Sequence, residues 1–359
     1  DLSYRTSIVV DSQSVSIANP GLALTGFEMG GDLRTNQGTP RDPVIVYYGG
    51  GITWNGFEIV DVLLGKGDET LSITDTSDRD ARDPAVTKDP NTITAIHGGG
   101  GDDTFTISGR GDGPLVIYGD TSEDRLRYSN AGPDASQHGT SFSNDGNDVI
   151  DARQMAEQSD GYVGLVAYGG FGNDTILGSQ DDDHLAGGTS RQGGRDVIDG
   201  QAGDDHIYGD SHFNVNVRIF AEDVQESESD NARVAQMFEV LDTTDGDDTD
   251  LGNASYRESA GADEITGGLG ADIIFGDHGV ITIKQGTRRL STTSSVERME
   301  TTQPAFGGAD TLRGYSADSA APADDEAADR IFGGQSGDEL DAGHGNSVVV
   351  GDHGLIDLG

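Results

Sequence analysis

Single large apolar residues recur along most of the chain, each placed two residues after an aspartate. The pattern is clearest in GGGGDDTFT (98–106), GGFGNDTIL (169–177) and GGLGADIIF (267–275). Side chains of a strand alternate between two faces, so a three-residue strand can turn its middle side chain inward. The glycines before each aspartate favour a tight turn with free carbonyl groups. The pattern therefore predicts a solenoid of short strands and glycine turns, in which each unit packs on its neighbours.

The repeat stays in phase over long stretches. From Gly169 the units begin at residues 169, 178, 187, 200 and 209. A disordered acidic linker would not keep an apolar residue at a fixed distance from each aspartate, so we favour the folded interpretation. The predicted inward positions are Phe105, Leu126, Ile150, Ile176, Leu185, Ile198, Ile207, Ile265, Ile274, Leu312, Ile331, Leu340 and Val349. A core this thin cannot offset the conformational entropy of the chain alone.

The turns supply the oxygen ligands that calcium prefers. Glycine carbonyls and aspartate carboxylates suit the flexible oxygen coordination of Ca²⁺ better than the strict octahedron of Mg²⁺. Zinc is disfavoured because cysteine is absent and the eight histidines are scattered. The form G-G-x-G-x-D-x-U-x, where U is apolar, is typical of calcium-binding parallel β-helices. We therefore predict several Ca²⁺ ions, with the ligands Asp103, Asp124, Asp148, Asp174, Asp183, Asp196, Asp205, Asp210, Asp263, Asp272, Asp277, Asp310, Asp338 and Asp352.

On these motifs, the chain resembles the RTX family, the hemolysin-type calcium-binding proteins, over most of residues 60–359. The resemblance implies an all-β fold, a right-handed parallel β-roll or β-helix stabilised by calcium, with polar loop insertions. It also implies that Asp174 shares an ion with Asp196, and Asp183 with Asp205, on one edge of the roll. Glu69 and Ser347 stand where the family pattern has aspartate. The family serves many biological roles, so the resemblance leaves the role of this chain open.

A larger repeat closes with a second kind of aspartate. Residues 261–283 align without gaps to 336–358, and more weakly to 194–216. Each copy contains two nonapeptides closed by Gly-Asp, which is followed by His or Ser. The spacing from the first turn aspartate to the last is therefore the same in all three: Asp196 to Asp210, Asp263 to Asp277, and Asp338 to Asp352. We expect each pair to share an ion; the alternative is that the last aspartate is an ordinary surface turn residue.

The pattern divides the chain into six segments. We expect a β-rich segment at 1–63 leading into the solenoid, a β-roll at 64–220, an insertion at 221–257, a roll module at 258–283, a second insertion at 284–304 and a last module at 305–359. Apolar spacing in NARVAQMFEVL (231–241) predicts a short helix. Trp54 is expected to pack in the solenoid rather than to bind a sugar.

The charge of the chain limits its partners. It has 64 Asp and Glu against 22 Lys and Arg, a formal charge of −42. Such charge with low hydrophobicity predicts disorder without metal and folding coupled to its binding. Nucleic acid and anionic membranes are disfavoured as partners, and no apolar run is long enough for membrane insertion.

No catalytic motif is present, since H-E-x-x-H and G-x-S-x-G are both missing. We therefore expect a non-enzymatic, secreted, extracellular segment of a surface layer, fibre or large adhesin. The alternatives are a secretion and folding domain of a secreted enzyme or toxin, or a carbohydrate-active β-helix enzyme. Expected partners are calcium, neighbouring segments of a larger protein or further copies joined end to end, and an extracellular polysaccharide. In such an assembly Leu355, Ile356 and Leu358 would be covered.

Overall fold

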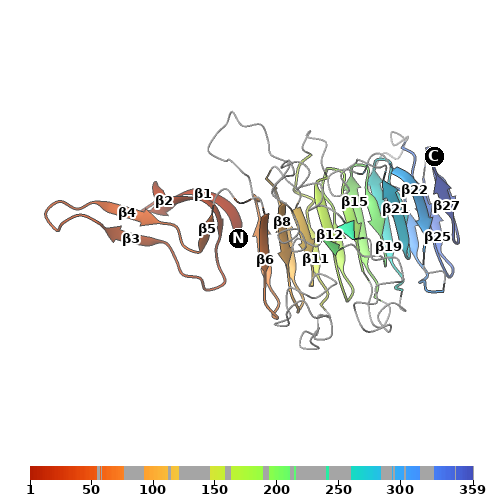
Figure 1. Cartoon of the computed structure of the whole chain (residues 1–359), viewed down its shortest axis with the longest axis horizontal. Helices are drawn as coiled ribbons and strands as arrows, with labels where there is room; N and C mark the ends of the chain where they lie inside the picture. The colour runs from red at the N-terminus through yellow and green to blue at the C-terminus, as the bar shows by residue number, and fades with distance from the viewer. Residues whose placement is uncertain are drawn as a thin grey trace, which may run out of the picture.

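A computed structural model shows the architecture of the chain (Figure 1). It describes residues 1–54, 57, 59–76, 93–111, 115–120, 146–157, 163–188, 194–210, 214–215, 240–241, 260–283, 293, 296–302, 305–315, 327–343 and 345–358. The elements over these ranges are strands, with no helix among them, and none of these segments could therefore cross a membrane as a helix. The all-β prediction is confirmed.

Two long parallel sheets face each other and form the roll. Sheet 1 contains β7 (Thr70–Ile73), β9 (Thr104–Ile107), β11 (Val149–Asp151), β13 (Thr175–Leu177), β15 (Val197–Ala202), β19 (Glu264–Leu269), β23 (Thr311–Arg313) and β25 (Glu339–Asp341), in this order. Sheet 2 contains β6 (Ile59–Leu63), β8 (Ile93–His97), β10 (Leu115–Tyr118), β12 (Leu165–Tyr168), β14 (His184–Ala186), β16 (His206–Tyr208), β20 (Ile273–Phe275), β24 (Arg330–Phe332) and β26 (Val348–Val350). The chain alternates between the sheets, which is the parallel β-roll expected from the sequence.

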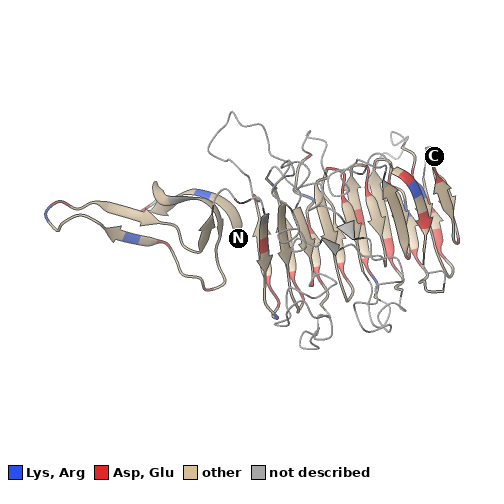
Figure 2. Ribbon diagram, viewed as in Figure 1, with Lys and Arg blue, Asp and Glu red and all other residues tan. Residues whose placement is uncertain are grey.

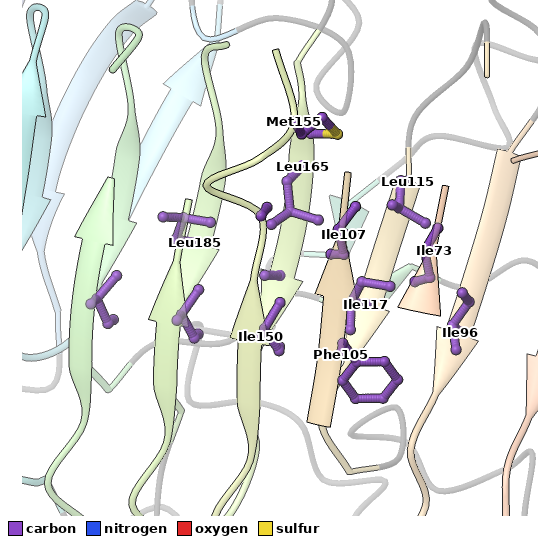
Figure 3. Packing of buried hydrophobic residues seen from close by; sticks show 14 of the residues in the cluster. Ile73, Ile96, Phe105, Ile107, Leu115, Ile117, Ile150, Met155, Leu165 and Leu185 are labelled. Atoms are coloured by element: carbon purple, nitrogen blue, oxygen red, sulfur yellow. The ribbon is translucent and has the colours of Figure 1, made fainter. Parts of the chain in front are cut away.

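The core lies between the two sheets (Figure 3). Ten of the predicted inward residues, from Phe105 to Ile331, are almost fully buried there. Leu340 is partly buried and Val349 is 46% exposed, because they belong to the last described rung. Leu126 lies outside the described residues. The sequence period therefore identified ten core positions correctly.

The core is thicker near the N-terminus than near the C-terminus. In β9 both Phe105 and Ile107 point inward, and in β10 both Leu115 and Ile117 do. From β13 onward, a typical strand has three residues and buries one of them inside, as Ile176 does. The sequence period predicted the thin rungs but did not reveal the thicker ones.

The N-terminal strands form an extension at one end of the roll (Figure 1). β1 (Leu2–Val10) joins β7 through the pair Leu2–Ile73 and pairs antiparallel with β2 (Gln13–Leu24), which pairs with β5 (Ile52–Trp54). β3 (Leu33–Asn36) and β4 (Ile45–Tyr48) form a hairpin. The predicted strands are thus present, and Trp54 packs against the main core.

A third, antiparallel sheet packs near the C-terminal half. It consists of β21 (Gly279–Ile283), β22 (Val296–Thr301) and β27 (Leu355–Asp357). Met299 of β22 packs with Phe275 and Phe332 on the outer face of sheet 2. Part of the expected insertion 284–304 is therefore a structural strand, β22.

The expected helix at 231–241 lies outside the described residues except at its end. There Val240 and Leu241 form β18 (Val240–Leu241), which pairs antiparallel with β17 (Asn214–Val215). At these two positions the helix prediction is wrong, because their backbone pairs with another strand.

Aromatic side chains line the outer face of sheet 2. Tyr118 stacks on His97 with ring centroids 4.5 Å apart, and Phe275 stacks on Phe332 at 4.6 Å. All four side chains are buried. Sequence reasoning missed this second apolar layer because it assigned only the middle residue of each strand to the interior.

Candidate metal centres

The turns that lead from sheet 2 to sheet 1, here called the first edge, carry a continuous column of aspartates. In each turn the backbone N–H of the acidic residue donates to Oδ1 of the aspartate in the next turn, at 2.6–3.1 Å. The column runs through Glu69, Asp103, Asp148, Asp174, Asp196, Asp263, Asp310 and Asp338. Figure 2 shows acidic residues recurring near the ends of successive strands. Glu69 keeps the register of the column although it is not an aspartate.

The second edge, formed by turns that lead from sheet 1 to sheet 2, carries a shorter column. Asp183 N–H donates to Asp205 Oδ1 at 2.8 Å, Asp205 N–H to Asp272 at 2.9 Å, and Asp272 N–H to Asp329 at 3.1 Å. Asp329 N–H then donates to Ser347 Oγ at 3.1 Å. Our sequence reasoning missed Asp329, although it lies two residues before the inward Ile331 and so obeys the rule of the other units.

The second carboxylate oxygen, Oδ2, of these aspartates lies close to the first glycine of its own turn. We call this glycine, with the oxygens that converge beside its Cα, a glycine cradle. A Cβ at Gly98 would overlap both Asp103 Oδ2 and the carbonyl oxygen of Gly119 in the next turn. The same overlap with a turn's own aspartate and the next glycine carbonyl recurs at Gly119, Gly169, Gly187, Gly209, Gly276 and Gly333 on the first edge, and at Gly178 and Gly200 on the second. Each first glycine is required because the oxygens of two successive turns converge beside its Cα.

Of these converging oxygens, most carboxylate oxygens lack donors among the described residues, whereas the carbonyls of Gly187 and Gly209 accept from the N–H of Gly170 and Gly188 at 2.9 and 2.8 Å. Oδ2 is buried without a hydrogen-bond donor among the described residues in Asp103, Asp148, Asp174, Asp205, Asp210, Asp263, Asp310 and Asp338. A buried charged oxygen without a partner is costly, so a cation is the physical complement of this arrangement. Carboxylate and carbonyl oxygens are hard ligands, which fit Ca²⁺.

Burial changes the protonation of the column in the absence of metal. It raises the pKa of Asp103, Asp148 and Asp183 to about 8, and that of Asp174 and Asp263 to about 7, and neighbouring carboxylates add to the shifts of several of them. The pKa of Asp196, Asp205 and Asp210 is raised well above its usual range for the same reason. Without a cation, the folded state therefore favours protonated carboxyl groups.

The pairs implied by the family resemblance are adjacent in the structure. Asp174 N–H donates to Asp196 Oδ1 at 2.8 Å, and Asp183 N–H donates to Asp205 Oδ1 at 2.8 Å. Each pair therefore lies in successive turns of one edge, which is what a shared ion requires.

Aspartates at the second turn position have a different role from those of the column. Asp277 accepts N–H donors at both oxygens, from Gly308 at 2.7 Å and from Gln335 at 2.6 Å. Asp210 Oδ1 accepts from Gly261 N–H at 2.8 Å. Asp120, which sequence reasoning missed although it also follows a glycine, accepts from Phe171 N–H at 2.8 Å. Each occurs where a long segment leaves the first edge, so the carboxylate ties the departing turn to a neighbouring one.

The three predicted pairs with this second aspartate all lie on the first edge, in successive turns. The negative charge of Asp277 helps to raise the pKa of Asp263, and that of Asp352 helps to raise the pKa of Asp338, after burial as the main cause. Asp352 itself is exposed in the last described turn. Shared ions at these pairs stay a prediction. Asp124 lies outside the described residues, and Asp148 fills the rung between Asp103 and Asp174.

A second ladder of amides and carboxylates runs beside the first-edge column. Asn147 N–H donates to Asp102 Oδ1 at 2.9 Å, Asn173 Nδ2 donates to Asn147 Oδ1 at 2.9 Å, and Arg195 N–H donates to Asn173 Oδ1 at 2.9 Å. Asn173 belongs to a glycosylation sequon, but its amide is used in this ladder. A glycan there would break the stacking of two turns.

Side chains alone do not form a metal cage in the described part of the chain, where no three His, Asp or Glu side chains gather around one point. This agrees with the arrangement above, in which a carboxylate oxygen of one turn converges with a glycine carbonyl oxygen of the next turn. Residues Asp103, Asp148, Asp174, Asp196, Asp263, Asp310 and Asp338 could hold ions on the first edge, and Asp183, Asp205, Asp272 and Asp329 on the second.

Comparison with protein families identifies the repeat itself. Residues 95–106, 166–190, 192–211 and 259–279 match the model of the RTX calcium-binding nonapeptide repeat, in four copies. No curated protein and no solved structure matches the chain significantly. The matched segments include turns of both edges, among them those of Asp103, Asp183 and Asp272.

Proposed function

Because the chain carries four RTX calcium-binding nonapeptide repeats, we propose that it is a calcium-stabilised structural or adhesive β-roll that works outside the cell. It would be a segment of a surface layer, a fibre or a large adhesin. Calcium is plentiful in that compartment, and the chain has no cysteine with which to form a disulfide. In this proposal the ions take the place that disulfides hold in other secreted proteins.

The observation that carries the proposal is the row of buried Oδ2 atoms facing the glycine carbonyls of the next turn. Each ion would bind oxygens from two successive turns and so join them. Binding to the folded state alone stabilises it by mass action, in proportion to the logarithm of the ion concentration. A non-enzymatic role agrees with this, since the buried turn carboxylates are explained by the columns and by the second-position aspartates.

Circular dichroism with and without calcium tests the proposal. In chelator we expect the β signal to fall strongly, with the remaining β signal coming from the N-terminal rungs, and millimolar Ca²⁺ should restore it while equal Mg²⁺ should not. Equal β content in chelator and in Ca²⁺ would refute metal-linked folding.

Assembly is the second part of the proposal. Val348, Val349, Leu355 and Leu358 of the last described rung and β27 are 41–53% exposed, and β25 and β26 are edge strands of their sheets. Open strand edges with apolar side chains are templates for pairing. We propose that a further strand covers them, from another copy or from a continuing solenoid. Sedimentation in Ca²⁺ should show self-association that Val349→Lys abolishes; a monomer at all concentrations would contradict association through this surface.

A further inference from the structure

Among the described residues, the aspartate column of the second edge stops at Asp183. The last bond of the column on this side is from Leu165 N–H to Asp183 Oδ1, at 2.8 Å. The described turns nearer the N-terminus bury other groups on this edge: the hydroxyl of Thr76, the guanidinium of Arg110 and the thioether of Met155. The first-edge column, in contrast, continues through the same rungs at Asp103 and Asp148.

The turn at which the second-edge column stops differs at two positions from the turn 267–272. At its second and fourth positions, residues 178–183 have Ser179 and Asp181, whereas in the turn 267–272 these positions are Gly268 and Gly270 with φ of +118° and +132°. Ser179 donates to Asp183 twice, from N–H to Oδ2 at 2.6 Å and from Oγ to Oδ1 at 2.8 Å. Both oxygens of Asp183 therefore have donors within the protein. In Asp205, by contrast, Oδ1 has a donor but Oδ2 has none among the described residues.

Asp181 pairs with an arginine from a second-edge turn nearer the N-terminus. Nη2 of Arg110, in the turn between β9 and β10, lies 3.5 Å from Asp181 Oδ2. Both residues are only 6% exposed. The turn of Arg110 is itself held by Gly111 N–H, which donates to Thr76 Oγ1 at 2.6 Å. The guanidinium is always charged, so a buried positive charge is built into this position.

We propose that Arg110 is the built-in cation of the second edge: its guanidinium replaces a calcium ion at Asp181 and ends the ion column there. This inference rests on the proposed calcium-stabilised function. It explains why Ser179 and Asp181 stand where the turn 267–272 has two glycines, since the cation beside Asp181 is an arginine side chain. The second edge of the N-terminal rungs would then be sealed without calcium.

Four variants and the unmodified protein test the proposal, with bound calcium per chain measured by equilibrium dialysis and calorimetry. Arg110→Ser leaves the Asp181 carboxylate without its cation, so we expect one additional ion per chain at saturation. Arg110→Lys keeps the charge and should bind the unmodified number, as should Arg110→Ser combined with Asp181→Asn. Arg153→Ser is the matched control, because Arg153 is exposed and pairs with Asp151 at 2.7 Å on the surface.

An unchanged number of ions in folded Arg110→Ser would overturn the proposal. If Arg110→Ser stays unfolded at every calcium concentration, the double variant decides. Folding of the double variant supports the proposal, because only the uncompensated carboxylate was harmful. Failure of both variants would show that Arg110 acts through packing and would overturn it. An unmodified protein that binds no calcium would instead refute the proposed function.

Discussion

The rungs near the N-terminus and those near the C-terminus hold the two sheets together in different ways. Around β9 and β10 each strand buries two side chains inside, Phe105 with Ile107 and Leu115 with Ile117. Here the first edge carries aspartates, while the second is closed by Arg110 and Met155. From β14 to β24 each strand of the two sheets buries one inward residue, such as Leu185 or Ile207, and aspartate columns run along both edges.

From this difference we infer that calcium could compensate for a smaller apolar core. Burying one side chain of this size contributes about 1.5–3 kcal/mol, so a rung that loses two inward residues loses several kcal/mol. In the thin rungs a second column of oxygen sites is present where that core is missing. We infer that the N-terminal rungs depend mainly on packing and the C-terminal rungs mainly on calcium.

The largest expected effect is the loss of packing in the thick rungs. Phe105 is 1% exposed, so Phe105→Ala should destabilise the protein by about 4 kcal/mol, nearly equally at low and high Ca²⁺. Thermal unfolding at both concentrations checks this. Phe57→Ala is the control, because Phe57 is 54% exposed and should change stability by less than about 0.5 kcal/mol. A Phe105→Ala defect that saturating calcium removes would contradict the assignment of these rungs to packing.

Closing a glycine cradle should have the next largest effect. In Gly200→Ala the new Cβ overlaps Asp205 Oδ2 and the Gly267 carbonyl oxygen, so we expect a loss of about 2–3 kcal/mol and one ion fewer per chain. Gly337→Ala serves as control, since nothing lies within 4 Å of its Cβ position. Calorimetric titration of both variants gives the number of bound calcium ions per chain. If Gly200→Ala binds as many ions as the unmodified protein, no ion is bound beside Gly200.

Removing one charge from the second-edge column should act locally. Asp205→Asn weakens one site and should destabilise the calcium-bound form by about 1–3 kcal/mol. Hydrogen exchange should increase in β14, β16 and β20 and stay unchanged in β9. Asp11→Asn, in an exposed turn of the N-terminal extension, should behave like the unmodified protein. An equal increase in amide hydrogen exchange in β9 and β16 would show that the rungs do not differ in metal dependence.

Acid should partly replace calcium. Burial raises the pKa of Asp103 and Asp310 to about 8 and of Asp277 to about 7 in the metal-free fold. A raised folded-state pKa stabilises the fold below the unfolded value near 4, and this contribution is lost as the pH rises through about 7–8. His206, whose pKa burial lowers, acts in the opposite direction. Chelated protein should therefore be more stable at pH 5 than at pH 8; a midpoint of denaturant unfolding that rises with pH would contradict this.

The sequence period predicted the roll, its inward ladder and most of the aspartates that form the two columns. This worked because each nonapeptide forms one turn and one strand. The same residue positions therefore have the same environment in every repeat. Asp329 could have been found by the same rule, since Ile331 follows it at the usual distance. Asp120 could have been found by comparison with Asp210, which also follows a glycine at the start of a turn.

Other features could not be predicted from the repeat. The ion pair of Arg110 with Asp181 joins residues 71 positions apart, since 181 − 110 = 71. The partner of Arg110 depends on which turns stack on one another. The insertions between the repeats differ in length, so the order of stacking cannot be read from the sequence. The stack of Tyr208 on Phe275 at 5.4 Å and strand β22 are likewise consequences of three-dimensional neighbours and not of period.

Hydrogen exchange in chelator and in Ca²⁺ tests the central claim most directly. We predict that removing calcium abolishes protection in β14, β16 and β20, while β8, β9 and β10 keep a large part of theirs, since a two-residue core and the Arg110 ion pair remain. Equal loss of protection in both groups, or earlier loss in β8 to β10, would contradict the claim that core and calcium substitute for each other along the roll.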